Sequence, residues 1–63
     1  MMMEEEMFKS MEGRRVFIET HSSRRYTGTI EKVESGFIKL LDKFKSIVFI
    51  SINEVNIIQE DSR

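Results

Sequence analysis

The chain of 63 residues contains no cysteine, no proline and no tryptophan, and it has a single histidine. Without cysteine there are no disulfide bonds or thiolate zinc sites, and His21 alone cannot form a histidine metal site within one chain. A domain of this length leaves much of its surface unburied, so an isolated monomer is only marginally stable. We therefore expect additional stability to come from oligomerisation.

Long apolar runs are also missing, and no stretch approaches the roughly 18 apolar residues that span a bilayer. No spacing resembles a phosphate-binding loop or a carboxylate pair. His21 beside Ser22 and Ser23 suggests a nucleophile and a base, but adjacent turn residues are rarely placed to hydrogen-bond, and no acid is positioned to orient the imidazole. We expect a soluble, cytoplasmic, non-enzymatic protein with no cofactor, no metal and no membrane partner.

The charge of the chain is unevenly distributed, although the net charge is only -1. Residues 14–46 contain eight Lys or Arg against four acidic residues, whereas the other acidic residues gather towards the two ends. A basic body permits a nucleic-acid surface, but charge of this size is more often the solvated face of a sheet.

Hydrophobic periodicity predicts one domain, residues 1–63, with a short helix followed by five strands. Met3, Met7 and Met11 recur every four residues with Phe8 beside them, which predicts a helix over about residues 3–12 that covers an open barrel end. A partner groove is the alternative interpretation of this methionine stripe. Period-two alternation then predicts strands at 15–20, 25–33, 37–41, 47–52 and 55–58, within a barrel over about residues 14–58, and a frayed tail at 59–63.

The segment from Arg25 to Ile30 carries the main signal for the fold. Tyr26, Gly28 and Ile30 fall on one face of a strand, so that this face has a gap at the glycine. A glycine inside a strand marks a bend, a bulge or a close approach of another backbone. We expect Gly28 to bend the second strand so that an all-β, five-stranded antiparallel sheet closes as a small barrel.

The predicted fourth strand, residues 47–52, has five apolar side chains out of six, so both of its faces avoid water. Either the strand bends to serve two cores, or one side packs against a neighbouring subunit. Ser51 and Glu54 have the spacing of a capping box, which predicts a single helical turn before the last strand.

This arrangement resembles the Sm-like (LSm) proteins. A helix, residues 13–18 and 25–30, and a third strand that ends in Asp42 resemble the first motif of that family, and residues 47–58 resemble the second. The resemblance covers about Met3 to Ile58. It implies a homo-oligomeric ring of six or seven subunits, in which the fourth strand of one subunit pairs with the fifth strand of the next, and which binds uridine-rich or adenine-rich RNA.

The base-binding residues of the family are largely replaced in this chain. The turn that typically carries Asp, Met and Asn reads Glu34-Ser35-Gly36-Phe37, and Asn53 and Glu54 stand where an Arg-Gly pair is usual. We therefore expect basic side chains to hold the RNA backbone, with Phe37 as a possible stacking surface. The predicted nucleic-acid contacts are Arg14, Arg24, Arg25, Ser35, Phe37, Lys43 and Asn53. The predicted subunit interface comprises Ile47, Phe49, Ile50, Val55 and Ile57.

A second hypothesis requires no nucleic acid. A protein-interaction or structural module of the same fold, or of a Src-homology-3-like or Tudor-like barrel, also explains the apolar strand, the methionine-rich helix and the missing base pocket. The local excess of basic residues weighs against it.

Overall fold

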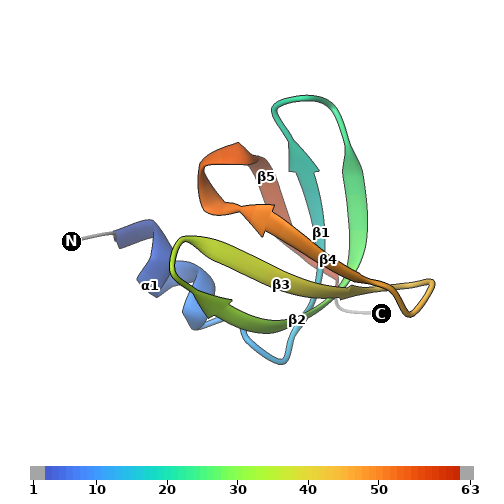
Figure 1. Cartoon of the computed structure of the whole chain (residues 1–63), viewed down its shortest axis with the longest axis horizontal. Helices are drawn as coiled ribbons and strands as arrows, with labels where there is room; N and C mark the ends of the chain where they lie inside the picture. Colours follow the sequence, from blue (N-terminus) through green and yellow to red (C-terminus); the bar gives the residue numbers. More distant parts are fainter. Residues whose placement is uncertain (1–2, 62–63) are drawn as a thin grey trace.

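The computed structural model describes residues 3–61, which form one short helix and five antiparallel strands in a single sheet (Figure 1). The predicted fold class, all-β with a short N-terminal helix, is confirmed. The elements are α1 (Met3–Lys9), β1 (Arg15–Thr20), β2 (Arg25–Glu34), β3 (Phe37–Asp42), β4 (Ile47–Ser51), the 3-10 turn η1 (Ile52–Glu54) and β5 (Val55–Glu60).

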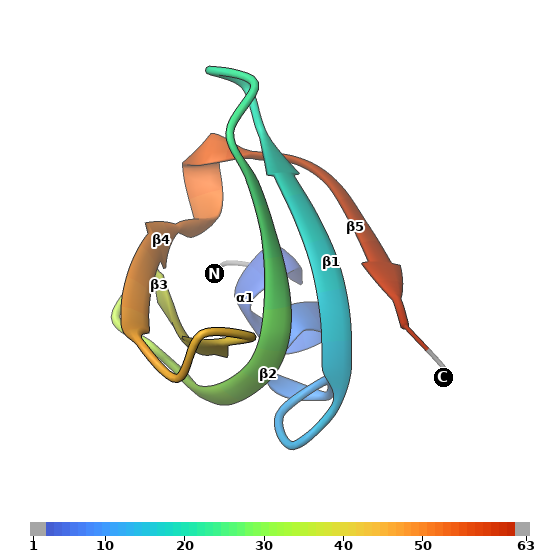
Figure 2. The same ribbon diagram turned by 90° about the vertical axis from the view of Figure 1, so that its right-hand side faces the viewer.

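The sheet is strongly bent, as predicted for a small barrel, but its outer strands do not pair with each other, so the barrel is open where closure was expected. Its strand order is β4-β3-β2-β1-β5, so β4 and β5 are free edges on opposite sides of the curled sheet (Figure 2). The chain turns away from β4 at η1, where the Glu54 carbonyl accepts a hydrogen bond from the His21 backbone N–H at 2.9 Å. Val55 then pairs with Thr20, so that β5 joins β1 rather than β4.

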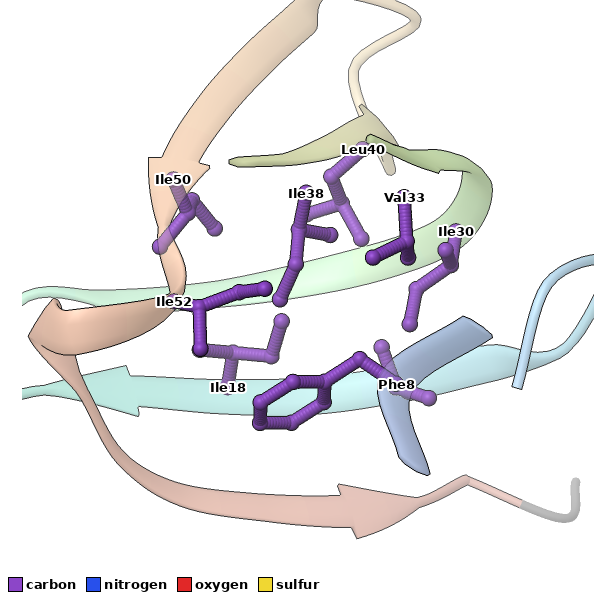
Figure 3. Close-up of a cluster of buried hydrophobic side chains, with 9 residues drawn as sticks. Phe8, Ile18, Ile30, Val33, Ile38, Leu40, Ile50 and Ile52 are labelled. Atoms are coloured by element: carbon purple, nitrogen blue, oxygen red, sulfur yellow. The ribbon is translucent and has the colours of Figure 1, made fainter. Parts of the chain in front are cut away.

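The core lies inside the curl of the sheet and receives one aromatic ring from α1 (Figure 3). Alternate residues of β1, β3 and β4 face inwards, as period-two patterning requires. Phe8 is 4% exposed, whereas Met7 is 52% exposed, so the helix docks through its phenylalanine. Met11, which follows the helix, is partly buried against the core. The buried apolar side chains are Phe8, Val16, Ile18, Ile30, Val33, Ile38, Leu40, Ile50 and Ile52.

The helix ends at Lys9, earlier than predicted. The chain from Met11 to Arg14 then lies beside β2 and forms hydrogen bonds with its backbone, although it is not a strand. The Gly13 N–H donates to the Ile30 carbonyl at 2.7 Å, and the Ile30 N–H donates to the Arg14 carbonyl at 3.0 Å. Further along, the Glu12 carboxylate accepts a hydrogen bond from the Val33 N–H at 2.7 Å. This segment therefore satisfies backbone groups of β2 beyond the region where β2 pairs with β1.

Two separate features shape β2. The register with β3 shifts between Ile30 and Lys32, so Glu31 is an extra residue in β2 with no partner in β3. As a result, Ile30 and Val33 both face the core although they are three positions apart. Gly28 is a place of close backbone approach: a Cβ there would lie 2.2 Å from the Leu41 carbonyl oxygen. Of the three interpretations of this glycine, the structure shows the close approach of another backbone, and the register irregularity lies at Glu31.

The tail predicted to be frayed is ordered as far as Asp61, while residues 62–63 lie outside the described part of the chain. β5 continues through Gln59 and Glu60, which pair with Phe17 and Val16 of β1. The Asp61 N–H also donates to the Arg15 carbonyl at 2.8 Å. Backbone pairing with β1 therefore extends β5 beyond the point where its apolar pattern stops.

Candidate nucleic-acid interface

Three of the predicted nucleic-acid residues, Ser35, Phe37 and Asn53, come together at one rim of the sheet. Ser35 (φ 56) and Gly36 (φ 82) both have left-handed backbone conformations, as a tight two-residue hairpin turn between β2 and β3 requires. The Gly36 carbonyl accepts a hydrogen bond from the Ile52 N–H at 2.9 Å. The β2–β3 turn therefore lies against η1, which carries Asn53.

The turn η1 is held by the predicted N-cap residue. The Ser51 hydroxyl accepts a hydrogen bond from the Asn53 N–H at 3.3 Å, one residue before the Glu54 that the capping-box spacing indicated. Ser51 is also paired with Phe37 across β3 and β4. The cap and the strand register together fix the positions of the Phe37 and Asn53 backbones relative to each other.

An open groove of about 480 Å³ lies beside this rim on the outer face of β2, β3 and β4. Lys39 is paired with Lys32 on one side and with Phe49 on the other, so these three residues form a row across three strands. Phe37 is 50% exposed and Phe49 is 65% exposed. The groove thus combines aromatic surfaces with ammonium groups, and its lining residues are Lys32, Glu34, Ser35, Phe37, Lys39 and Phe49.

Lys32 and Lys39 were not among the predicted contacts, and Phe49 was predicted only as an interface residue. Alternation along β3 places Lys39 on the same face as Phe37, which is a signal that the sequence contains. Lys32 reaches this face only because the extra residue Glu31 reverses the alternation of β2. The aromatic and basic character of the groove therefore depends on a β-bulge.

The predicted arginine contacts are partly neutralised within the chain. Arg14 Nη1 lies 2.6 Å from Glu60 Oε2, and Arg25 Nε lies 3.7 Å from Glu19 Oε1. Arg15 makes a similar pair with the acidic C-terminal segment. Exposed pairs of this kind contribute about 0–1 kcal/mol and are broken readily, but they compete with an external phosphate.

Arg24 and Lys43 form no ion pair with any side chain of residues 3–61. Arg24 lines a smaller hollow of about 140 Å³ together with Tyr26 and Glu54, between the β1–β2 turn and η1. Lys43 lies in the turn after β3, at the opposite end of that strand from Phe37. The seven predicted contacts therefore do not form one surface.

The predicted subunit-interface residues belong to the two edge strands, and most have exposed side chains. Ile47 is 45% exposed, Phe49 is 65% exposed and Ile57 is 42% exposed, while Val55 is half-buried against the core. Ile50 differs from the prediction: its side chain is 4% exposed and packs in the core, because alternation along β4 turns it inwards. The exposed apolar edge residues are Ile47, Phe49 and Ile57.

Two further properties concern only the described part of the chain. Residues 3–61 include no helix with the length and apolar character needed to cross a membrane. No group of three or more His, Asp or Glu side chains within that range is arranged to hold a metal ion.

Comparison of the chain with protein-family models, with curated proteins and with solved structures gave no significant match.

Proposed function

We propose that the chain forms a head-to-tail homo-oligomeric ring that binds RNA, as the resemblance to Sm-like proteins implies. The observation that carries this proposal is the pair of free edges: β4 and β5 are the two outer strands of one bent sheet. Each edge presents unpaired backbone groups, and each carries an exposed apolar side chain, Phe49 on β4 and Ile57 on β5.

Pairing of β4 in one subunit with β5 in the next is a heterologous contact. Such contacts produce rings when the rotation between subunits closes, and a ring leaves no free strand edge. Assembly would also cover apolar surface in a chain too short to bury a large core of its own. Six or seven subunits is the number that the family resemblance implies.

RNA binding is supported by the groove on the outer face of β2, β3 and β4. Stacking of a base on an aromatic side chain such as Phe37 contributes about 1–3 kcal/mol, and lysines such as Lys32 and Lys39 attract the phosphate backbone. Ser35 and Asn53 lie at the adjoining rim and offer polar groups for hydrogen bonds. This arrangement favours single-stranded RNA over a duplex, whose bases are stacked on one another.

Native mass spectrometry tests the ring. The wild-type chain should give a single closed oligomer, and Ile57→Glu should reduce it to monomers because a carboxylate would be buried at the paired edge. Met7→Glu is the matched control, since Met7 is similarly exposed but lies on α1. A wild-type protein that is monomeric at micromolar concentration would refute the ring, as would an Ile57→Glu protein that stays folded and fully assembled.

Fluorescence anisotropy with a labelled, A/U-rich single-stranded RNA tests binding. Affinity should fall as salt rises, with a slope of about 0.7 in log K against log salt for each phosphate contact. Phe37→Ala should weaken binding by about 5-fold to 100-fold, the loss expected for one stacked base. A ring that shows no RNA binding at low salt would instead support the protein-interaction module, without nucleic acid.

A further inference from the structure

The turn between β3 and β4 has features that neither the ring nor the groove explains. Phe44, at its tip, is 76% exposed, the highest value among the large apolar side chains of residues 4–61. We propose that this turn is a second contact for single-stranded RNA, in which Phe44 stacks on a base and Arg15, Lys43 and Lys45 hold a phosphate. The proposal rests on the RNA-binding function proposed above.

The turn is held rigidly, although it is exposed. The Asp42 side chain accepts a hydrogen bond from the Phe44 N–H at 2.9 Å, and the Asp42 carbonyl accepts one from the Lys45 N–H at 2.9 Å. The Lys43 N–H donates to the Thr27 carbonyl at 3.0 Å, which ties the turn to β2. A turn whose backbone is already ordered loses little backbone conformational entropy when a ligand binds.

The geometry around the Phe44 ring suits a stacked base. Lys43 Nζ lies over the Phe44 ring, 5.4 Å from its centroid, and Phe44 is still 76% exposed, so a base stacked on this ring would lie beside a cation. β3 separates this turn from Phe37 by about 17 Å, using the ordinary rise of a strand. The two aromatic side chains therefore contact different nucleotides.

A hollow of about 200 Å³ beside the turn supplies a place for a phosphate. Arg15, Lys43 and Lys45 all line it. Asp42 also lines the hollow, and its carboxylate accepts hydrogen bonds from the turn backbone. Arg15 pairs with Asp61 at 3.1 Å, so a phosphate would compete with that exposed pair. A phosphate here would meet two lysines with no ion-pair partner within residues 3–61.

The backbone at Lys45 provides an independent argument. Lys45 has φ 71, a left-handed conformation that glycine or asparagine adopts more readily than lysine. A three-residue hairpin turn of this kind usually has glycine at that position. Lysine is therefore present against the conformational preference of the turn, which is the kind of strain that functional sites contain.

A membrane surface is a weaker match for this turn than RNA. Membrane-binding segments insert a continuous apolar face, whereas Phe44 stands between two lysines, which Asp42 and Ser46 flank in turn. The hollow beside it also includes the hydroxyl-bearing residue Thr29. A single aromatic ring next to a polar, cationic hollow matches the alternating base and phosphate of a single strand.

The test uses the full chain and the same labelled, A/U-rich single-stranded RNA. Phe44→Ala should reduce affinity by about 5-fold or more, with an unchanged melting temperature because the side chain is exposed. Phe44→Trp should restore affinity, and in a chain without other tryptophans its fluorescence should be quenched by RNA. Lys45→Gly should reduce the slope of log K against log salt concentration by about 0.7, the contribution of one phosphate contact, while the melting temperature rises or stays constant.

The result of the Phe37→Ala variant separates this proposal from the RNA-binding function itself. If Phe37→Ala weakens binding while Phe44→Ala and Lys45→Gly bind with wild-type affinity, the second contact is refuted and the groove remains. If the wild-type chain binds no RNA, both proposals fail. A Phe44→Trp fluorescence that shifts to the blue with anionic phospholipid vesicles and does not respond to RNA would assign the turn to a membrane surface and refute the proposal.

Discussion

Replacement of Gly28 by alanine should damage the fold more than any other single methyl group added to the sheet. The new Cβ would lie 2.2 Å from the Leu41 carbonyl oxygen and 2.7 Å from the Asp42 Cα, whereas ordinary van der Waals contact begins at 3.4 Å. The β2 and β3 backbones would have to separate by roughly 1 Å at a point where they are paired. Gly28 is also paired with Val16 of β1, so β2 cannot shift freely the other way.

The expected loss of stability is large for a chain of this size. Overpacking costs about 1–3 kcal/mol when side chains can adjust, and here the opposing atoms are backbone, so we expect about 3 kcal/mol or more. A 63-residue domain has a total stability of about 3–9 kcal/mol. Because 1 kcal/mol corresponds to about 4–8 °C in a domain of this size, the melting temperature should fall by about 12–24 °C.

Thermal unfolding followed by circular dichroism measures this loss, at one protein concentration because assembly adds to stability. Gly36→Ala is the matched control: nothing lies within 4 Å of its added Cβ, but its φ of +82° is unfavourable for alanine. Gly36→Ala should lower the free energy of unfolding by about 1–2 kcal/mol, and Gly36→Asn should lower it by less. A Gly28→Ala protein that melts within a few degrees of the wild type would refute the close approach.

Three other changes test separate contacts of the fold by the same measurement. Phe8→Ala should cost about 3–5 kcal/mol and unfold much of the protein, because the ring is buried in the core; a small effect would mean that α1 is not docked. Truncation after Ile58 should lower the melting temperature, since residues 59–61 form backbone pairs with β1, and an unchanged value would mean that this segment is frayed. Glu12→Ala should cost about 1–3 kcal/mol by leaving the Val33 N–H without its acceptor, whereas Glu12→Gln should retain most of the stability.

The sequence was sufficient to predict the order of the elements, because each strand has its own run of apolar residues and polar or glycine residues mark the turns between them. It also contains a signal for the β-bulge. Ile30 and Val33 are both buried, although strict alternation would place residues three positions apart on opposite faces of the strand. An extra residue between them turns both side chains to the same face. The same bulge places Lys32 on the outer face beside Lys39. Strict alternation along β2 would put Lys32 on the inner face, so it does not predict this part of the groove.

Neither alternation nor local composition predicts ion pairs between residues that lie far apart in the sequence. The basic body and the acidic C-terminal segment looked like separate features, yet Arg14 and Arg15 pair with Glu60 and Asp61 across two adjacent strands. Those pairs depend on the β1–β5 register, which spans more than 40 residues of sequence. Local charge counting therefore overstated the free positive charge around the start of β1.

The position of Phe49 links assembly to RNA binding in the proposed ring. Phe49 lies on the free edge strand β4 and also lines the groove that contains Phe37 and Lys39. A neighbouring β5 paired with β4 would therefore border the groove and restrict the orientations of the Phe49 ring. Coupling between two sites is reciprocal, so a ring that orders the groove must itself be stabilised by RNA. RNA should then shift native mass spectra towards the closed oligomer at low protein concentration, and Lys39→Gln should weaken this shift without removing the ring formed at high concentration.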